Sequence, residues 1–148
     1  MILLIYFLFF SEEYGRDEPY TTYQYNLRLF RELRRYLAYK EQIGSLYFLI
    51  TVVGNIVAFM PFGFLVPVLY REQRREATHN GHYFRSFLFV TVLGFLLSLG
   101  VETIQLISKV GCFDVDDLML NTSGVVLGYL IYYVSKKIIG VLEIYRRR

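Results

Sequence analysis

The stretch Phe95–Gly128, FLLSLGVETIQLISKVGCFDVDDLMLNTSGVVLG, decides the fold because it joins two long apolar runs through a short acidic connection. A carboxylate inside a bilayer costs about 2.5–3.5 kcal/mol on insertion scales. Glu102 lies deep inside the first run and therefore needs a hydrogen-bonding partner, a water-filled cavity or a proton. Further polar residues follow on both sides of the junction: Gln105 in the first run, Asp114, Asp116 and Asp117 in the connection, and Asn121 in the second run.

The composition of the whole chain is that of an integral membrane protein. Of its 148 residues 55% are hydrophobic, and the mean hydropathy is +0.37. The net charge of +3 is small and indicates no nucleic-acid partner. Because about 20 helical residues cross the hydrocarbon core, three apolar runs are predicted to span it: residues 46–70, 86–107 and 118–135. We therefore predict an all-α fold, a polytopic transmembrane helical bundle, in which residues 1–148 form a single domain with its core at 26–135.

Two segments before the first full span are predicted to be helical. Met1–Phe10 is apolar, but at about 1.5 Å per residue it covers only half of a span. We expect a partial N-terminal helix, the last part of a longer one, with a short tilted or interfacial anchor as the alternative. Asn26–Gln42 repeats apolar residues every three to four positions, with arginines on its other faces. It is expected to be an interfacial amphipathic helix or a loop helix packed on protein.

The spacing of polar residues predicts that the second and third spans face each other. Ser98, Glu102 and Gln105 follow i, i+4, i+7 spacing, so they share one helix face. Asp117 and Asn121 are four residues apart and share a face of the third span. We expect these two polar faces to turn toward one another in the bundle.

Small residues and a proline predict where the helices pack. Gly124 and Gly128 form a G-x-x-x-G pair, which allows two helices to approach closely. In the first span Pro61 cannot donate a backbone hydrogen bond, so the carbonyl of Val57 is released and a kink is expected there. Gly63 follows in the same turn. We assign Pro61, Gly63, Gly124 and Gly128 to helix packing.

The distribution of basic residues predicts the orientation of a multi-pass protein of the cell membrane. Arg71–Arg85 and the C-terminal tail carry most of the basic residues, whereas the aspartate connection carries only Lys109. The positive-inside rule puts the C-terminus in the cytoplasm and the aspartates outside. The arginines of Asn26–Gln42 then lie outside too, which conflicts with the rule unless they meet lipid phosphates. In this orientation the polar faces form a pocket that opens toward the outer leaflet.

Three stretches carry motifs with fixed spacing. They are Asn26-Leu27 with Phe30 and Tyr36; GNIVAFMPFGFLVP, Gly54–Pro67; and VETIQ with GCFDVDDLMLNTSGVVLGY, within Val101–Tyr129. They resemble the VanZ-like family of small membrane proteins: its segment before the second helix, its N…F-x-P-x-G helix and its E-x-x-Q…D-D…N-x-x-G…G signature. The chain departs from the family at Leu29, where a proline is usual, and near Cys112, where a loop arginine is frequent. The resemblance implies reduced susceptibility to teicoplanin-type antibiotics.

Three readings of the function remain open. In the first, the protein is not an enzyme and binds an amphiphile in the membrane, either a lipoglycopeptide or a lipid-linked wall precursor. In the second, Glu102 is a general acid or base of an intramembrane enzyme, since burial disfavours its charged form, with Asp117 or another aspartate as partner. No nucleophile–base pair is apparent, which argues against an enzyme. The candidate ligand-binding residues are Asn55, Glu102, Gln105, Asp114, Asp117 and Asn121.

In the third reading the buried polar residues only hold the helices together, through hydrogen bonds of about 0.6 kcal/mol each. Asp116 is then expected to face water, and Asp117 to cap the last helix. The partners are membrane lipids and the amphiphile, and no cofactor and no metal is expected. Cys112 is the single cysteine, His79 and His82 lack further ligands, and the D-x-D-D sequence lacks the glycine and distant Glu of an EF-hand.

Overall fold

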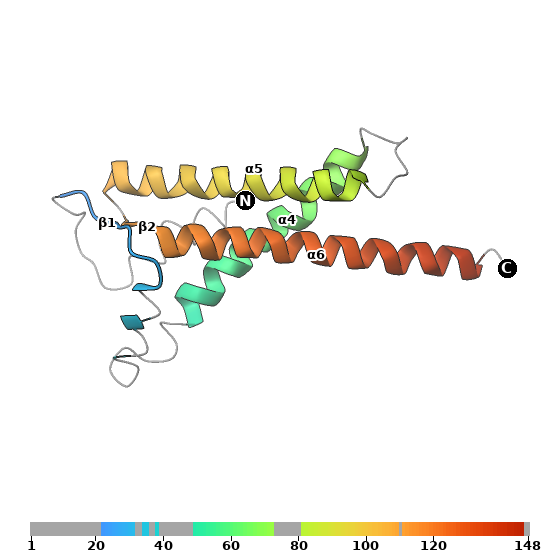
Figure 1. Ribbon diagram of the computed structural model, residues 1–148, viewed down its shortest axis with the longest axis horizontal. Coiled ribbons are helices and arrows are strands. Elements are labelled where there is room, and N and C mark those ends of the chain that lie inside the picture. The colour runs from blue at the N-terminus through green and yellow to red at the C-terminus, as the bar shows by residue number, and fades with distance from the viewer. Residues whose placement is uncertain are drawn as a thin grey trace.

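The computed structural model describes residues 22–31, 34, 35, 38, 49–72, 81–109 and 111–146. Three long helices form most of this part, and α5 and α6 run side by side while α4 crosses them (Figure 1). The predicted all-α bundle is therefore confirmed. The elements in order are β1 (Tyr25–Asn26), the π-helical η1 (Leu49–Val53), α4 (Gly54–Glu72), α5 (Gly81–Ser108), β2 (Phe113–Asp114) and α6 (Val115–Arg146).

Each long helix contains a stretch that is long and apolar enough to cross a membrane. These stretches are Thr51–Tyr70, Arg85–Ser108 and Val115–Gly140, and they confirm the three predicted spans. Large apolar side chains are exposed along all three, whereas several of the most buried side chains are polar. This is the reverse of a water-soluble protein, in which charged residues are almost never fully buried. This pattern is typical of a helical bundle that spans a membrane.

The third helix begins at Val115, before the predicted start of the span at Leu118. A side-chain oxygen of Asp114 accepts a hydrogen bond from the backbone N–H of Asp116 at 2.8 Å, which is the contact of an N-cap. Asp116 and Asp117 lie in the first turn, where the positive end of the helix dipole stabilises negative charge. The expectation that Asp117 caps this helix is therefore wrong, because Asp114 caps it.

The segment expected to form a helix over Asn26–Gln42 does not begin as one. Tyr25 and Asn26 form β1, which pairs in parallel with β2, Tyr25 opposite Phe113 and Asn26 opposite Asp114. Phe30 has a φ of 61°, a left-handed conformation that a helix cannot continue through. The predicted helix is therefore wrong at its start, although Arg31, Arg34, Arg35 and Ala38 are helical. Its other positions, and Met1–Phe10, lie outside the described residues.

Glycines bring the backbones of α4 and α6 into contact. A Cβ atom built on Gly124 would overlap the carbonyl oxygen of Ile56, and one on Gly128 would overlap that of Met60. A Cβ on Gly63 would in turn overlap the carbonyl oxygen of Val125. At Gly124 and Gly128 the backbone of α6 thus lies directly against that of α4.

An apolar cluster fills the bundle beside this contact. Its buried members are Phe59, Val90, Val125, Tyr129 and Tyr132. α4 continues as one helix through Pro61 to Glu72, and Pro61 is on its exposed side. The close contact with α6 is thus made at Gly63, and the kink at Pro61 stays a prediction.

Candidate functional site

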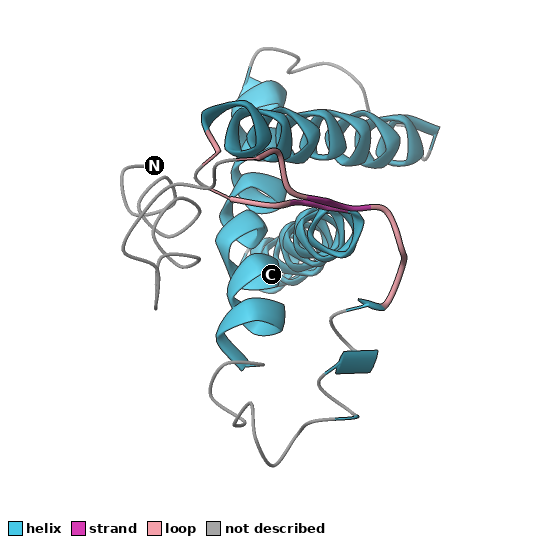
Figure 2. Cartoon of the chain, turned by 90° about the vertical axis from the view of Figure 1, so that its left-hand side faces the viewer, coloured by secondary structure: helices cyan, strands magenta, loops and turns pink. Residues whose placement is uncertain are grey.

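Buried polar side chains gather where the two short strands meet α5 and the start of α6. We call Asn26, Glu102, Asp114 and Asp116 the polar centre; all four are buried, at 3%, 2%, 7% and 5% exposure. Figure 2 shows the short sheet in magenta at this end of the bundle, with loops leading to it from distant parts of the chain. The polar centre therefore joins segments that are far apart in sequence.

Glu102 links α5 to the strand that precedes α6. Its carboxylate oxygen Oε2 accepts a hydrogen bond from the backbone N–H of Asp114 at 3.1 Å. Ser98 and Gln105 are also buried on this side of α5, which confirms that the three residues share an inward face. The buried Glu102 thus has the hydrogen-bonding partner that its place in an apolar run requires.

Asp114 receives hydrogen bonds from two directions. The side-chain amide of Asn26 lies 3.0 Å from both of its carboxylate oxygens, and the N–H of Asp116 donates to one of them. Burial raises the pKa of Asp114 above its ordinary value of 3.8, and the charge of Asp116 acts in the same direction. The hydrogen bonds from Asn26 and Asp116 and the charge of Arg31 act against this rise.

Asp116 does not face water, contrary to our expectation. It is 5% exposed, and its carboxylate accepts a hydrogen bond from the backbone N–H of Phe30. Residues 22–31, which we call the strap, run across this end of the bundle and provide that N–H group. The left-handed φ of Phe30 occurs at the residue that makes the contact.

A second set of polar contacts, which we call the second layer, connects the three spans. Its Ser98 and Asn121 lie about one helical turn from Glu102 and Asp117 along their helices. The Asn121 side-chain amide donates to the hydroxyl of Ser98 at 2.9 Å, joining α6 to α5. The Asn55 amide donates to Asp117 at 2.6 Å, joining α4 to α6. The remaining oxygen of Asn121 is buried without a hydrogen-bond partner. Buried acceptors of this kind are usually satisfied by a protein group or an ordered water molecule.

The structure brings five of the six predicted ligand-binding residues together in two layers, and Gln105 is buried on the same side of α5 as Glu102. Glu102 and Asp114 are in the polar centre, whereas Asn55, Asp117 and Asn121 are in the second layer. Asn26 and Asp116 are not among the ligand-binding residues predicted from the sequence. Asn26 occurs in a motif of the sequence, but its contact with Asp114 depends on a strand pair that spacing alone does not reveal.

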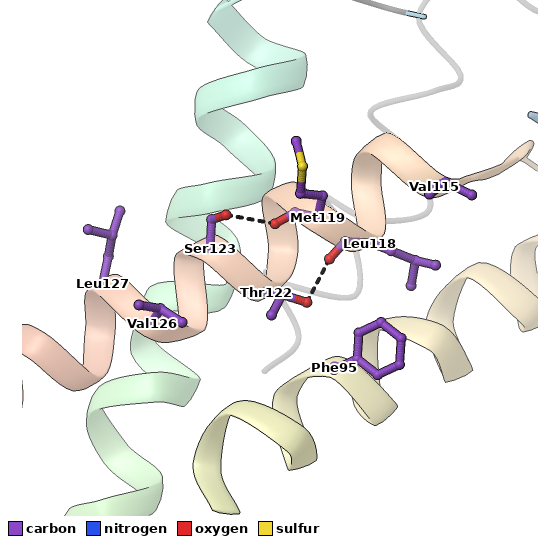
Figure 3. Close-up of a pocket in the computed structure, with 8 residues that line it drawn as sticks. All are labelled: Phe95, Val115, Leu118, Met119, Thr122, Ser123, Val126 and Leu127. Carbon is purple, nitrogen blue, oxygen red and sulfur yellow. Dashed lines mark hydrogen bonds between the residues drawn. The ribbon is translucent and has the colours of Figure 1, made fainter. Parts of the chain in front are cut away.

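An apolar groove lies beside these layers, between α5 and α6 (Figure 3). It has a volume of about 660 Å³ and is lined by Phe95 of α5 and by residues of α6 between Val115 and Leu127. None of the predicted ligand-binding residues lines it. We call it the α5–α6 groove.

The described residues contain no group of three or more His, Cys, Asp and Glu side chains that could hold a metal ion. The chemistry present in the two layers is that of carboxylates, amides and one hydroxyl. These groups can accept and donate hydrogen bonds and can hold a proton.

Two comparisons with known proteins find relatives of the chain. The family model described as VanZ/LLP1 matches residues 1–137. The chain is also 35% identical over 86 residues to Protein VanZ of Enterococcus faecium. That alignment covers 58% of the chain and 46% of the relative, so it spans less than half of the relative's length. No solved structure matches the chain.

Proposed function

Because the chain belongs to the VanZ/LLP1 family, we propose that it lowers susceptibility to teicoplanin-type glycopeptides by binding an acylated amphiphile in the membrane. The apolar surface of the bundle accepts the acyl chain, and the polar centre with its second layer meets the head group. The protein then acts by occupancy and needs no chemical reaction.

The observation that carries this proposal is the burial of Glu102. It is 2% exposed inside a membrane-spanning stretch, and its Oε2 accepts a hydrogen bond from the backbone N–H of Asp114. A glutamine at this position would accept the same hydrogen bond without the cost of a carboxyl group in the membrane. A residue kept only to hold helices together has no need of a titratable group, so Glu102 favours a binding role.

The contacts of the polar groups favour binding over catalysis. Ser98, a buried hydroxyl on the same face of α5 as Glu102, is hydrogen-bonded to the amide of Asn121, which is not a base. Nucleophilic catalysis requires a base within hydrogen-bonding reach of the nucleophile. Glu102 and Asp114 remain candidates for acid–base work on a lipid-linked substrate, which is the alternative function.

The orientation is part of the proposal. With the C-terminus in the cytoplasm, the polar centre lies at the outer surface and its second layer in the outer leaflet. A glycopeptide that approaches from outside then meets the strap and the polar centre first. The arginines at positions 31, 34 and 35 are exposed and lie at headgroup level in this arrangement, where lipid phosphates are their natural partners.

The experiment is expression of the chain in a susceptible Gram-positive host. Teicoplanin carries an acyl chain and vancomycin does not, so we expect the inhibitory concentration of teicoplanin to rise and that of vancomycin to stay close to the vector control. Equal protection against both drugs would instead indicate a changed wall precursor. No protection against either, with the protein confirmed in the membrane, rejects the proposal.

A further inference from the structure

We propose that the strap binds the membrane surface through its outer face, and that anionic phospholipids bound there hold it closed over the polar centre. This goes beyond the proposed function, because it gives the strap a lipid contact and a closing role whichever end of the bundle is cytoplasmic. The outer face consists of the large exposed side chains of the strap, which are Tyr23, Tyr25, Leu27, Leu29 and Phe30.

The two sides of the strap differ in polarity. Tyr23, Tyr25 and Leu27 are 61%, 65% and 64% exposed, whereas Asn26 is 3% exposed and donates to Asp114. Successive side chains of an extended segment point to opposite sides, so the polar side chain lies toward the protein and the apolar ones lie away from it. This arrangement suits a segment whose outer face lies in an apolar or interfacial environment.

Contacts at both ends of the strap fix it at the level where the spans end. Near its start, the ammonium group of Lys109 lies 5.1 Å from the centre of the Tyr23 ring, and Lys109 directly follows the second apolar stretch. Near its end, the backbone N–H of Phe30 donates to the carboxylate of Asp116, in the first turn of α6. The strap therefore runs along the ends of two spans.

The strand pair places the middle of the strap at the same level. β1 pairs with β2, which ends directly before the third apolar stretch begins at Val115. Paired strands lie about 4.8 Å apart, and the headgroup region on each side of the hydrocarbon core is about 5–8 Å thick. The outer face is thus within reach of that region, where tyrosine is enriched in membrane proteins.

The charge around the outer face identifies the lipid. Among the described residues from 22 to 38, every charged side chain is an exposed arginine, at positions 28, 31, 34 and 35. The guanidinium group matches phosphate with paired N–H donors, and basic residues at a membrane surface are attracted to anionic lipids. A second copy that offered the same face would bring arginines against arginines, which repel. The occupant that fits is an anionic phospholipid.

Lipid binding and closure of the polar centre use opposite sides of one segment. On the inner side, Asn26 and the N–H of Phe30 donate to Asp114 and Asp116. A lipid that binds the closed strap more tightly than the open one favours closure by the same factor. Anionic lipid should therefore lower the fraction of molecules in which the strap is open.

The depth of the outer face can be measured with a single fluorophore, because the chain contains no tryptophan. Leu27→Trp places one on the outer face, and Leu96→Trp, at an exposed position near the middle of the second apolar stretch, is the control. Each variant is reconstituted into liposomes whose phospholipids carry bromine, a quencher, near the head group or near the end of the acyl chain. We expect the shallow bromine to quench Leu27→Trp more strongly and the deep bromine to quench Leu96→Trp more strongly.

The head group is tested with the same reporter. The shallow bromine is carried either by anionic phosphatidylglycerol or by zwitterionic phosphatidylcholine, and we expect the anionic lipid to quench Leu27→Trp more strongly. Arg28→Gln combined with Arg34→Gln should abolish this preference. Arg85→Gln combined with Lys137→Gln removes the same charge from exposed positions at the opposite end of the spans, and should leave the preference unchanged.

Closure is measured in the parent chain by hydrogen exchange at the backbone N–H groups of Phe30 and Phe113, which donate to Asp116 and to the carbonyl of Gln24. We expect slower exchange at both in anionic than in zwitterionic liposomes. Equal exchange in the two membranes would overturn the closing role.

The quenching results decide the lipid contact. Leu27→Trp that neither bromine quenches would overturn it, and emission that instead shifts with the protein-to-lipid ratio would identify a second copy as the occupant. Equal quenching by the two head groups would overturn the choice of an anionic lipid. No readout uses an antibiotic, so drug protection without these lipid effects rejects only this inference, and the lipid effects without drug protection reject only the proposed function.

Discussion

The side-chain amide of Asn26 lies 3.0 Å from both carboxylate oxygens of Asp114, across 88 positions of the sequence. Asp114 is also the N-cap of α6 and holds Glu102 through its backbone N–H. One aspartate therefore connects the strap, the second span and the start of the third span. Changes at either end of this contact are expected to affect both the closure of the polar centre and the stability of α6.

Asn26→Ala removes the side-chain donor from a buried carboxylate. Leaving a buried acceptor without its donor costs about 1–3 kcal/mol, so we expect a lower unfolding temperature in detergent and faster hydrogen exchange in the strap. Gln24→Ala is the control, because among the described residues the Gln24 side chain donates to nearby Thr22 and not to the polar centre. If both variants behave like the parent, the contact does not hold the strap.

The stability of the folded state should depend on pH through Asp114. Burial raises the pKa of this carboxyl above 3.8 in the folded protein, and the negative charge of Asp116 adds to the rise. The hydrogen bonds from Asn26 and from the backbone N–H of Asp116, together with the positive charge of Arg31, oppose it. A raised folded pKa means that the folded state binds the proton more tightly than the unfolded state. The contribution of Asp114 to the stability of the folded state is therefore fully present below pH 3.8. It is lost as the pH rises through the raised pKa of the folded protein.

The measurement is the unfolding temperature from about pH 4 to about pH 7, in the parent protein and in Asp114→Asn, which cannot titrate at this position. The difference between the two curves isolates Asp114 from the neighbouring Glu102 and Asp116. We expect the parent to lose stability relative to the variant as the pH rises. A relative gain over the same range would contradict the assignment.

The spans could be predicted from the sequence because their signals are local. The length of each apolar run predicts a helix, and a glycine pair predicts a close contact between helices. Spacing of three to four residues predicts that Ser98, Glu102 and Gln105 share an inward face. The polar centre could not be predicted in full, because it depends on a strand pair between segments before the first span and after the second. The same pairing explains two errors: Asn26 was placed in a helix, and Asp116 was expected to face water.

Substitution of the glycines at the α4–α6 contact by larger residues should destabilise the fold. Gly124→Ala and Gly128→Ala each place a methyl group against a backbone carbonyl of α4, and overpacking of this kind costs about 1–3 kcal/mol. Gly100→Ala is the matched control, since a Cβ there meets nothing within 4 Å. We expect lower unfolding temperatures in detergent for the first two variants and no loss for the third. Equal effects at all three positions would mean that helix propensity and not packing is being measured.

The accessibility of the Cys112 thiol from outside the cell tests the predicted orientation in the membrane. It lies between α5 and β2, is partly exposed, and is the single cysteine of the chain. A membrane-impermeant maleimide should label it in intact cells if the aspartate end is outside, and Cys112→Ser should remove the label. Labelling that appears only after permeabilisation would place the C-terminus outside the cell instead.

The most direct measurement compares Glu102→Gln with the parent protein for protection against teicoplanin at equal membrane abundance. Glutamine keeps the side-chain oxygen that accepts the Asp114 N–H, so the fold should persist while the titratable group is lost. Thr103→Ala, at an exposed neighbouring position, is the control and should protect like the parent. The account predicts that Glu102→Gln accumulates normally and loses most of the protection. Full protection by Glu102→Gln, together with failure of Glu102→Leu, would show that Glu102 serves only as a hydrogen-bonding link between helices.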